Sequence, residues 1–201
     1  MYQIILASES PRRKEIMETM GIKYKVLVAN VEEIVEEKVP SEMVQAVARL
    51  KTNAVYHRPE LLAEEYQKVI VIGADTMVFY KEHALGKPKN EADAVRMLQM
   101  LSDDVHEVYT GVSIIIRDKD KEVERISFAV CTKVAVQSLS LEQIKDYIAT
   151  GEPMDKAGAY AIQGKFGIFI KEIIGDYYNV VGFPIAQIYD ALLQKGIDIK
   201  K

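Results

Sequence analysis

The densest group of chemically capable side chains lies in the segment Ser8-Glu-Ser-Pro-Arg-Arg13. Ser10 followed by Pro11 is the usual order of an N-cap and a first helical residue, so a helix is expected to begin here. A helix N-terminus offers free N–H groups and partial positive charge, and arginine adds paired donors that suit phosphate oxygens. Arg12 and Arg13 are unfavourable in a first helical turn unless they meet an anion. The segment indicates a phosphate site, with a solvated helix end as the alternative.

An acidic residue follows a strongly apolar run in Val69-Ile-Val-Ile-Gly-Ala-Asp75-Thr76. Residues 69–73 are typical of a buried strand, and ligands of α/β proteins gather at the carboxyl ends of such strands. Asp75 in that place could bind a divalent cation or orient a water, and Thr76 adds a hydroxyl group. An aspartate that only caps a loop is the alternative.

Two lysines lie at positions that single them out as candidate ligands for an anion. Lys51 falls on the apolar face of a helix expected over residues 41–58, the face that carries Val44, Val47, Ala48 and Val55. A lysine on such a face must either extend to solvent or meet an anion. Lys87 lies between Gly86 and Pro88, and these two residues predict an irregular loop. Because the loop restrains the lysine, it would lose little conformational entropy on binding a ligand. The alternatives are that Lys51 only extends its ammonium group to solvent and that residues 86–88 form a simple turn.

The segment Met154-Asp-Lys-Ala-Gly-Ala-Tyr-Ala-Ile-Gln-Gly164 combines an acid, a base, two glycines and an amide. The amide of Gln163 presents a donor and an acceptor, which can recognise the edge of a nucleobase. The segment is not a Walker A loop, because five residues separate Gly158 from Gly164 and Lys165 is followed by Phe166.

Hydrophobic periodicity and capping residues predict the elements that position these side chains. Strands are expected at residues 3–7, 24–31, 69–73, 108–117, 124–137 and 168–174. Helices are expected at 11–20, 41–58, 90–101, 141–148 and 184–193, with Ser10, Ser41, Asn90 and Ser140 as caps and a capping box between Ser140 and Gln143. The charged turn 118–121 joins two strands into a long hairpin. This order predicts an α/β fold with a mixed sheet. No firm domain boundary is visible, although a second lobe could be built on the hairpin, roughly over residues 104–150.

Composition narrows the class of protein. The chain has 201 residues, 49% hydrophobic and 28% charged, which is typical of a globular protein with a real core. The net charge of −4 disfavours a charge-driven nucleic-acid or membrane binder. The single cysteine, Cys131, excludes an intramolecular disulfide and a cysteine-based zinc site, and it is expected to be a small buried residue. His57, His83 and His106 lack metal-ligand spacing. Without an apolar stretch of about 18 residues, no membrane span is expected, and the cytoplasm is the expected location.

Taken together, these segments resemble the Maf family of nucleoside triphosphate pyrophosphatases. They keep the family's order and span nearly the whole chain, and jointly they are far more specific than any one alone. The matching segments are residues 6–13, 31–33, 73–76, 86–88, 106–110, 155–164 and 179–184.

The resemblance implies a single domain over residues 1–201 with a mixed twisted sheet, flanking helices, a long hairpin and two lobes with a cleft, as in inosine triphosphatases. The form of residues 155–164 is similar to the branch that hydrolyses dTTP and UTP to the monophosphate and pyrophosphate. That activity implies the removal of unwanted nucleotides before incorporation. The family is also associated with arrest of cell division.

The resemblance also implies roles for individual residues. Asp75 would be the proton acceptor. Arg12, Thr76 and Gln163 would select the substrate, and the phosphates would meet Ser8, Arg13, Lys51 and Lys87. Glu33, or Glu32 in its place, would join Asp75 at a divalent cation, Mg²⁺ or Mn²⁺. The implied partner is a small nucleotide, with neither nucleic acid nor membrane, and a homodimer stays open.

The residues alone leave open which base Gln163 recognises, and they allow alternatives to an enzyme. A glutamine amide can pair with uracil or, rotated by 180°, with cytosine, so Gln163 favours pyrimidines without excluding CTP or modified forms. A non-catalytic nucleotide sensor is the main alternative to an enzyme, but Asp75, Lys51 and Lys87 are all present. A nucleic-acid binder using residues 12–14 lacks support from net charge and from aromatic platforms, since the chain has no tryptophan.

Overall fold

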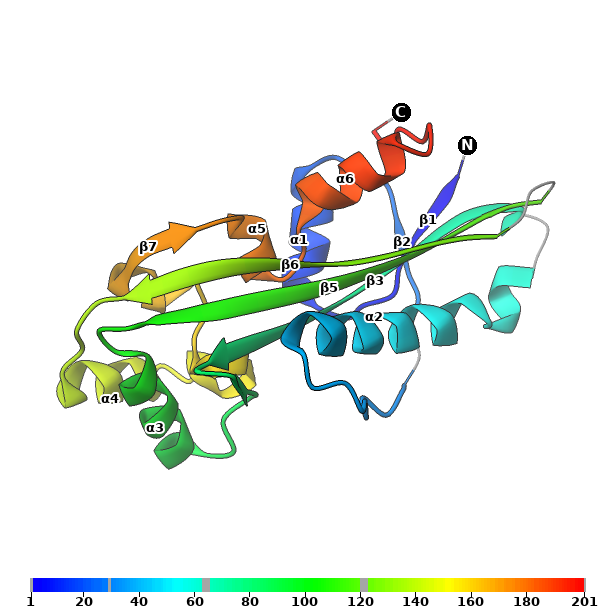
Figure 1. Ribbon diagram of the computed structural model, residues 1–201. Coiled ribbons are helices and arrows are strands. Elements are labelled where there is room, and N and C mark those ends of the chain that lie inside the picture. The colour runs from blue at the N-terminus through cyan, green and yellow to red at the C-terminus, as the bar shows by residue number, and fades with distance from the viewer. Residues whose placement is uncertain (1, 29, 63–65, 120–122, 201) are drawn as a thin grey trace. The chain divides into compact units, whose positions relative to one another are not determined.

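The computed structural model describes residues 2–28, 30–62, 66–119 and 123–200. Within them, helices surround one mixed sheet of seven strands in the order β2-β1-β3-β5-β6-β7, with β4 paired to β3 (Figure 1). β1 is parallel to β2 and β3, whereas β4 is antiparallel to β3 and β7 is antiparallel to β6. The predicted α/β fold with a mixed sheet is therefore confirmed.

The strands are β1 (Gln3–Leu6), β2 (Lys25–Val26), β3 (Lys68–Tyr80), β4 (His83–Leu85), β5 (Val105–Asp118), β6 (Glu124–Val136) and β7 (Ile170–Ile174). The helices are α1 (Pro11–Thr19), α2 (Pro40–Tyr56), α3 (Glu91–Leu101), α4 (Leu141–Ala149), α5 (Tyr177–Val181) and α6 (Ile185–Leu193). Short 3-10 turns occupy Pro59–Leu62, Glu152–Asp155, Ala157–Ala159 and Lys165–Phe169. None of the helices in the described ranges is long and apolar enough to cross a membrane.

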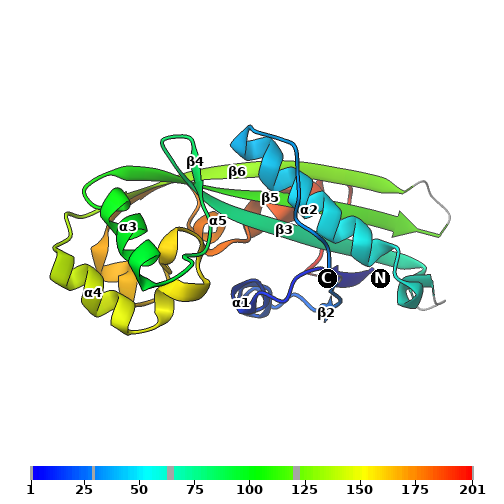
Figure 2. The same ribbon diagram turned by 90° about the horizontal axis from the view of Figure 1, so that it is seen from below.

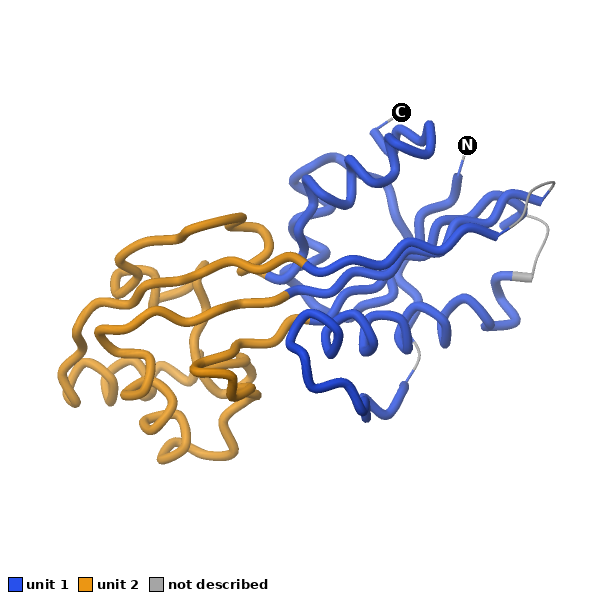
Figure 3. The backbone as a smooth tube through the Cα atoms, viewed as in Figure 1, with its two compact units in different colours: residues 1–75, 110–129, 182–201 blue, residues 76–109, 130–181 orange. Residues whose placement is uncertain are grey.

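The chain divides into two compact units (Figure 3). Unit 1 comprises residues 1–75, 110–129 and 182–201, and unit 2 comprises residues 76–109 and 130–181. The second lobe expected over 104–150 was therefore wrong in its bounds. The reason is that β3, β5 and β6 are long enough to contribute residues to both units, so three of the four boundaries fall inside strands and one falls between α5 and α6. The single domain over 1–201 stays a prediction.

In unit 1, α2 lies along one face of the sheet and α6 along the other (Figures 1 and 2). Two glycines allow α2 to approach the strands closely. A Cβ atom on Gly73 would lie 2.2 Å from Thr52 Oγ1, and one on Gly111 would lie 2.2 Å from the backbone of Val44. The helix therefore sits directly on β3 and β5, which brings Lys51, the neighbour of Thr52, close to the segment that follows Gly73.

In unit 2, α3 and α4 cover an apolar core that includes Leu98, Tyr147 and Phe166. Local capping holds both helices as predicted. The side chain of Asn90 accepts a hydrogen bond from the Asp93 N–H at the start of α3. Ser140 and Gln143 form the expected capping box at the start of α4.

Other predicted boundaries were wrong. The strand expected at 24–31 is β2, only Lys25–Val26, and Ala29 lies outside the described residues. Neither Ser10 nor Ser41 caps a helix with its side chain, and Ser41 lies inside α2. A proline fills the first helical position of α1 and of α2, and its fixed φ favours that place without a side-chain cap. β4 and α5 were not predicted from the sequence.

Candidate active site

An ammonium group between two carboxylates forms the centre of the charged cluster in unit 1. Lys51 Nζ donates a hydrogen bond to Asp75 Oδ1 at 2.7 Å and lies 2.9 Å from Glu33 Oε1. The side chains of Asp75, Lys51 and Glu33 are 10%, 20% and 50% exposed. The lysine on the apolar face of α2 therefore meets anions, which is one of the two alternatives predicted for it.

Asp75 does not follow the strand, as the sequence suggested, but lies inside β3, which continues to Tyr80. Its flanking residues on both sides are held in the sheet, so its carboxylate starts from a rigid backbone. Of the two neighbouring glutamates that the sequence left open, Glu33 is the one that pairs with Lys51.

Arg13 is the most deeply placed cation of this cluster. Its Nε donates to the Gly182 carbonyl at 2.8 Å, and its Nη1 donates to Ser8 Oγ at 2.9 Å. Burial lowers the pKa of the Arg13 guanidinium, whereas the negative charge of Asp75 raises it, and an arginine still stays protonated at neutral pH. Two fixed hydrogen bonds thus hold a desolvated positive charge in one orientation near Asp75.

Ser8 is buried between β1 and α1, and its hydroxyl oxygen accepts two hydrogen bonds. Its Oγ accepts from the Ser10 N–H at 3.2 Å as well as from Arg13. Arg12 is half-buried in the first turn of α1, and its charge acts on Arg13. Unit 1 therefore brings together Ser8, Arg13, Glu33, Lys51 and Asp75.

The other three predicted site residues belong to unit 2. Thr76 follows Asp75 in β3 and is half-buried, whereas Lys87 and Gln163 are exposed. A backbone hydrogen bond from Gly158 N–H to the Gly86 carbonyl, 3.1 Å long, joins the loop of Lys87 to the loop of Gln163. This connection was not predicted from the sequence.

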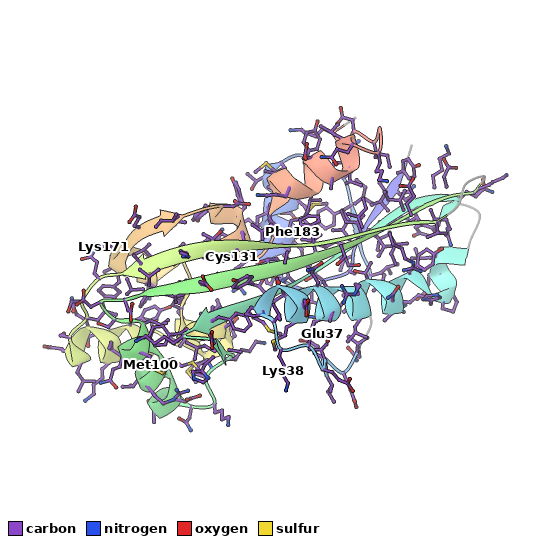
Figure 4. All side chains as sticks on the ribbon, in the orientation of Figure 1. Glu37, Lys38, Met100, Cys131, Lys171 and Phe183 are labelled. Carbon is purple, nitrogen blue, oxygen red and sulfur yellow. The ribbon has the colours of Figure 1, made fainter. Side chains whose placement is uncertain are left out.

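Two further predictions concern cysteine and histidine. Cys131 lies on β6 (Figure 4) and is exposed, so the expectation of a buried cysteine was wrong. His106 is buried, and its Nε2 lies 2.8 Å from the hydroxyl of Tyr160. The Gly182 carbonyl, which accepts from Arg13, was not predicted either, because a backbone oxygen carries no signal in the residue types.

Two carboxylates of the cluster are the candidate ligands for a divalent cation. Asp75 and Glu33 both direct an oxygen at one positively charged atom, Lys51 Nζ, so their carboxylates can approach a common cation. The described part of the chain holds no cluster of three or more His, Cys, Asp or Glu side chains arranged for a metal. Mg²⁺ is commonly held by one or two carboxylates together with substrate phosphates. The residues therefore fit a hard cation that is shared with a phosphorylated ligand.

The whole chain is similar to known proteins. Residues 3–195 match the family model described as Maf-like protein. A dTTP/UTP pyrophosphatase of Lachnoclostridium phytofermentans is 49% identical over 202 residues, covering 100% of this chain and 99% of that protein. One from Agathobacter rectalis is 47% identical over 205 residues, covering 99% and 100%. The solved structure of a HAM1 protein from Coxiella burnetii is 11% identical with a TM-score of 0.53, covering 96% of this chain and 100% of that one, a likeness in fold alone.

Proposed function

The chain belongs to the Maf-like protein family, and we propose that it hydrolyses nucleoside triphosphates, chiefly dTTP and UTP, to the monophosphate and pyrophosphate. The names of relatives that are nearly half identical over their whole length support this proposal. The structural observation that carries it is the pairing of Asp75 with Lys51 beside the buried Arg13. That cluster offers positive charge for a polyphosphate and a carboxylate base.

In the proposed mechanism, Arg13 and Lys51 bind phosphate oxygens and neutralise their charge. Hydrogen bonds to Gly182 and Ser8 fix the guanidinium in advance, so little reorganisation is needed during the reaction. Asp75 takes the proton from a water that attacks the α-phosphorus. The bond from the α-phosphorus to its bridging oxygen then breaks, and pyrophosphate leaves.

Glu33 and Asp75 are proposed to hold a divalent cation, Mg²⁺ or Mn²⁺. Such a cation, when bound, offsets charge on the phosphate oxygens. Lys51 already bridges these two carboxylates, so it is suited to keep them close together. Oxygen ligands of this kind favour hard cations over zinc.

Substrate selection is proposed for Arg12, Thr76 and Gln163, with Lys87 as a further phosphate contact. Gln163 is exposed and free to present its amide to a base. That amide suits uracil and thymine and also accommodates cytosine in a rotated position. CTP and modified pyrimidine nucleotides are therefore secondary substrates to test.

The wider proposal is a cytoplasmic enzyme that acts as one domain, residues 1–201, and removes unwanted nucleotides before incorporation. Nucleic acids and membranes are not proposed as partners, given the net charge of −4. Light scattering would decide between a monomer and a homodimer.

The test is a panel of triphosphates with identification of the products. We expect pyrophosphate and the monophosphate from dTTP and UTP in one step, with little orthophosphate. Asp75→Asn keeps the size of the side chain and should lower turnover by about 10²-fold or more. Orthophosphate as the first product would contradict the assignment, and nucleotide binding without turnover would favour a sensor.

A further inference from the structure

Gln163 lies in a tight turn whose two ends are held together. The Gly164 N–H donates to the Ala161 carbonyl at 3.1 Å, which closes a β-turn over residues 161–164. Gln163 is the third residue of that turn, and its side chain is exposed. A turn of this size presents one side chain outward, but exposed turns are mobile unless other groups hold them.

Two side chains outside the turn hold both of its ends. The Ala161 N–H donates to the Tyr147 hydroxyl at 3.2 Å, and that hydroxyl donates to Glu152 Oε1 at 2.8 Å. The other oxygen, Glu152 Oε2, accepts from the Lys165 N–H at 3.1 Å. A continuous series of hydrogen bonds therefore links Ala161, the first residue of the turn, to Lys165, the residue just after it. The series passes through Tyr147 and Glu152.

Packing fixes the two side chains that form this chain. Tyr147 is 4% exposed, and its ring centroid lies 5.0 Å from that of the fully buried Phe166. Burial and the hydrogen bond to Glu152 raise the pKa of Tyr147, so its hydroxyl keeps the proton that it donates. A Cβ atom at Gly164 would lie 2.3 Å from Glu152 Oε1, so the carboxylate fills the space that a larger residue would need.

We propose that Tyr147 and Glu152 are positioning residues that hold Gln163 ready to bind the base of the substrate. The inference rests on the proposed function, in which Gln163 contacts the base. Loss of either side chain's hydrogen bonds frees the backbone beside Gln163, and the binding of a base must then restore that order. The phosphate contacts proposed for Arg13 and Lys51 do not involve this turn, because no residue of the 161–164 turn belongs to the charged cluster around Lys51.

The experiment uses Tyr147→Phe, which removes only the hydroxyl, and Glu152→Gln, which retains one of the two acceptor oxygens. Tyr80→Phe is the matched control, because Tyr80 donates to a different carboxylate of unit 2, Asp104 Oδ2, at 2.7 Å. The kinetic parameters for dTTP and UTP are measured together with inhibition by tripolyphosphate, which has no base. Hydrogen exchange of the Ala161 and Lys165 amides reports the state of the turn without any activity.

We expect the KM for dTTP and UTP to rise about 3- to 10-fold in Tyr147→Phe, the usual range for one lost hydrogen bond, with kcat nearly unchanged. Glu152→Gln should also raise the KM for dTTP and UTP. The inhibition constant of tripolyphosphate should stay constant, and both amides should exchange faster. Tyr80→Phe should leave all of these values as in the unmodified protein.

Three results would overturn the inference: unchanged KM values in both variants, an equal weakening of dTTP and tripolyphosphate, or unchanged amide exchange. The first two would show that the turn is not held for the base, and the third that it is not held by these side chains. A failure of the proposed function looks different, because the unmodified protein would then release no pyrophosphate from any nucleotide.

Discussion

Replacing Lys51 with methionine removes one positive charge and keeps a side chain of similar length. The ammonium of Lys51 lies 2.7 Å from Asp75 Oδ1 and 2.9 Å from Glu33 Oε1, so the change leaves two carboxylates without their shared partner. The two carboxylates respond differently. Glu33 is half exposed and regains water, whereas the Asp75 side chain is only 10% exposed and is hydrated poorly.

The size of the effect follows from this burial. Breaking a fully buried ion pair costs about 3–5 kcal/mol, and an exposed pair contributes about 0–1 kcal/mol. Lys51 and Asp75 lie between these limits, and the nearby Arg13 still offsets part of the Asp75 charge. We therefore expect a loss of about 2 kcal/mol in the free energy of unfolding, or about 4–8 °C in melting temperature for a chain of this size.

The assay is urea unfolding followed by circular dichroism, together with pyrophosphate release from dTTP. Lys51→Met should lose stability and most of its turnover. The double variant Lys51→Met/Asp75→Asn should be more stable than Lys51→Met, because no buried carboxylate is left unpaired. Lys68→Met is the control, since Lys68 pairs with the buried Asp118 at 3.0 Å in the same unit, and it should leave turnover unchanged.

The reasoning would be refuted if Lys51→Met were as stable as the unmodified protein and the second substitution restored nothing. That result would mean that Lys51 and Asp75 do not form the pair described. Full turnover in Lys51→Met would remove Lys51 from the proposed mechanism, whatever its effect on stability.

Three further predictions concern the base, the metal and pH. Gln163→Glu should weaken dTTP and UTP about 10- to 100-fold more than CTP, because a carboxylate cannot donate to uracil O4; kinetics on the three nucleotides test this, and an equal loss on all would contradict it. Chelation by EDTA should abolish turnover, and added Mg²⁺ or Mn²⁺ should restore it; turnover that persists in EDTA would disprove the metal proposal. Burial lowers the pKa of His106 to about 4 from its usual 6.5, so as the pH falls through that window the unfolded chain binds a proton that the folded chain does not. Up to about 3 kcal/mol of stability is lost there; in urea unfolding at several pH values, His106→Gln should remove much of this loss, the exposed His57→Gln should not, and equal profiles would refute the assignment.

Local chemistry explains which elements the sequence predicted well. The capping box of Ser140 and Gln143 and the cap of Asn90 join groups three residues apart, so neighbouring residues alone decide them. The α/β class was also predicted correctly, because strand-like and helix-like patterns of apolar residues alternate along the chain. The Ser10 and Ser41 caps failed because a proline next to each could begin the helix by itself.

Contacts between distant residues were decided by the tertiary structure. The sequence by itself determined that Lys51 must meet an anion or reach solvent, because a charge on an apolar helix face is costly to bury alone. Which anion it meets depended on the packing of α2 against Gly73, which places Asp75, 24 residues further on, beside the ammonium. Likewise, the acceptor of Arg13 is a carbonyl 169 residues away. Residue types indicate which groups need partners, but only the packing of strands and helices brings a particular partner within hydrogen-bond distance.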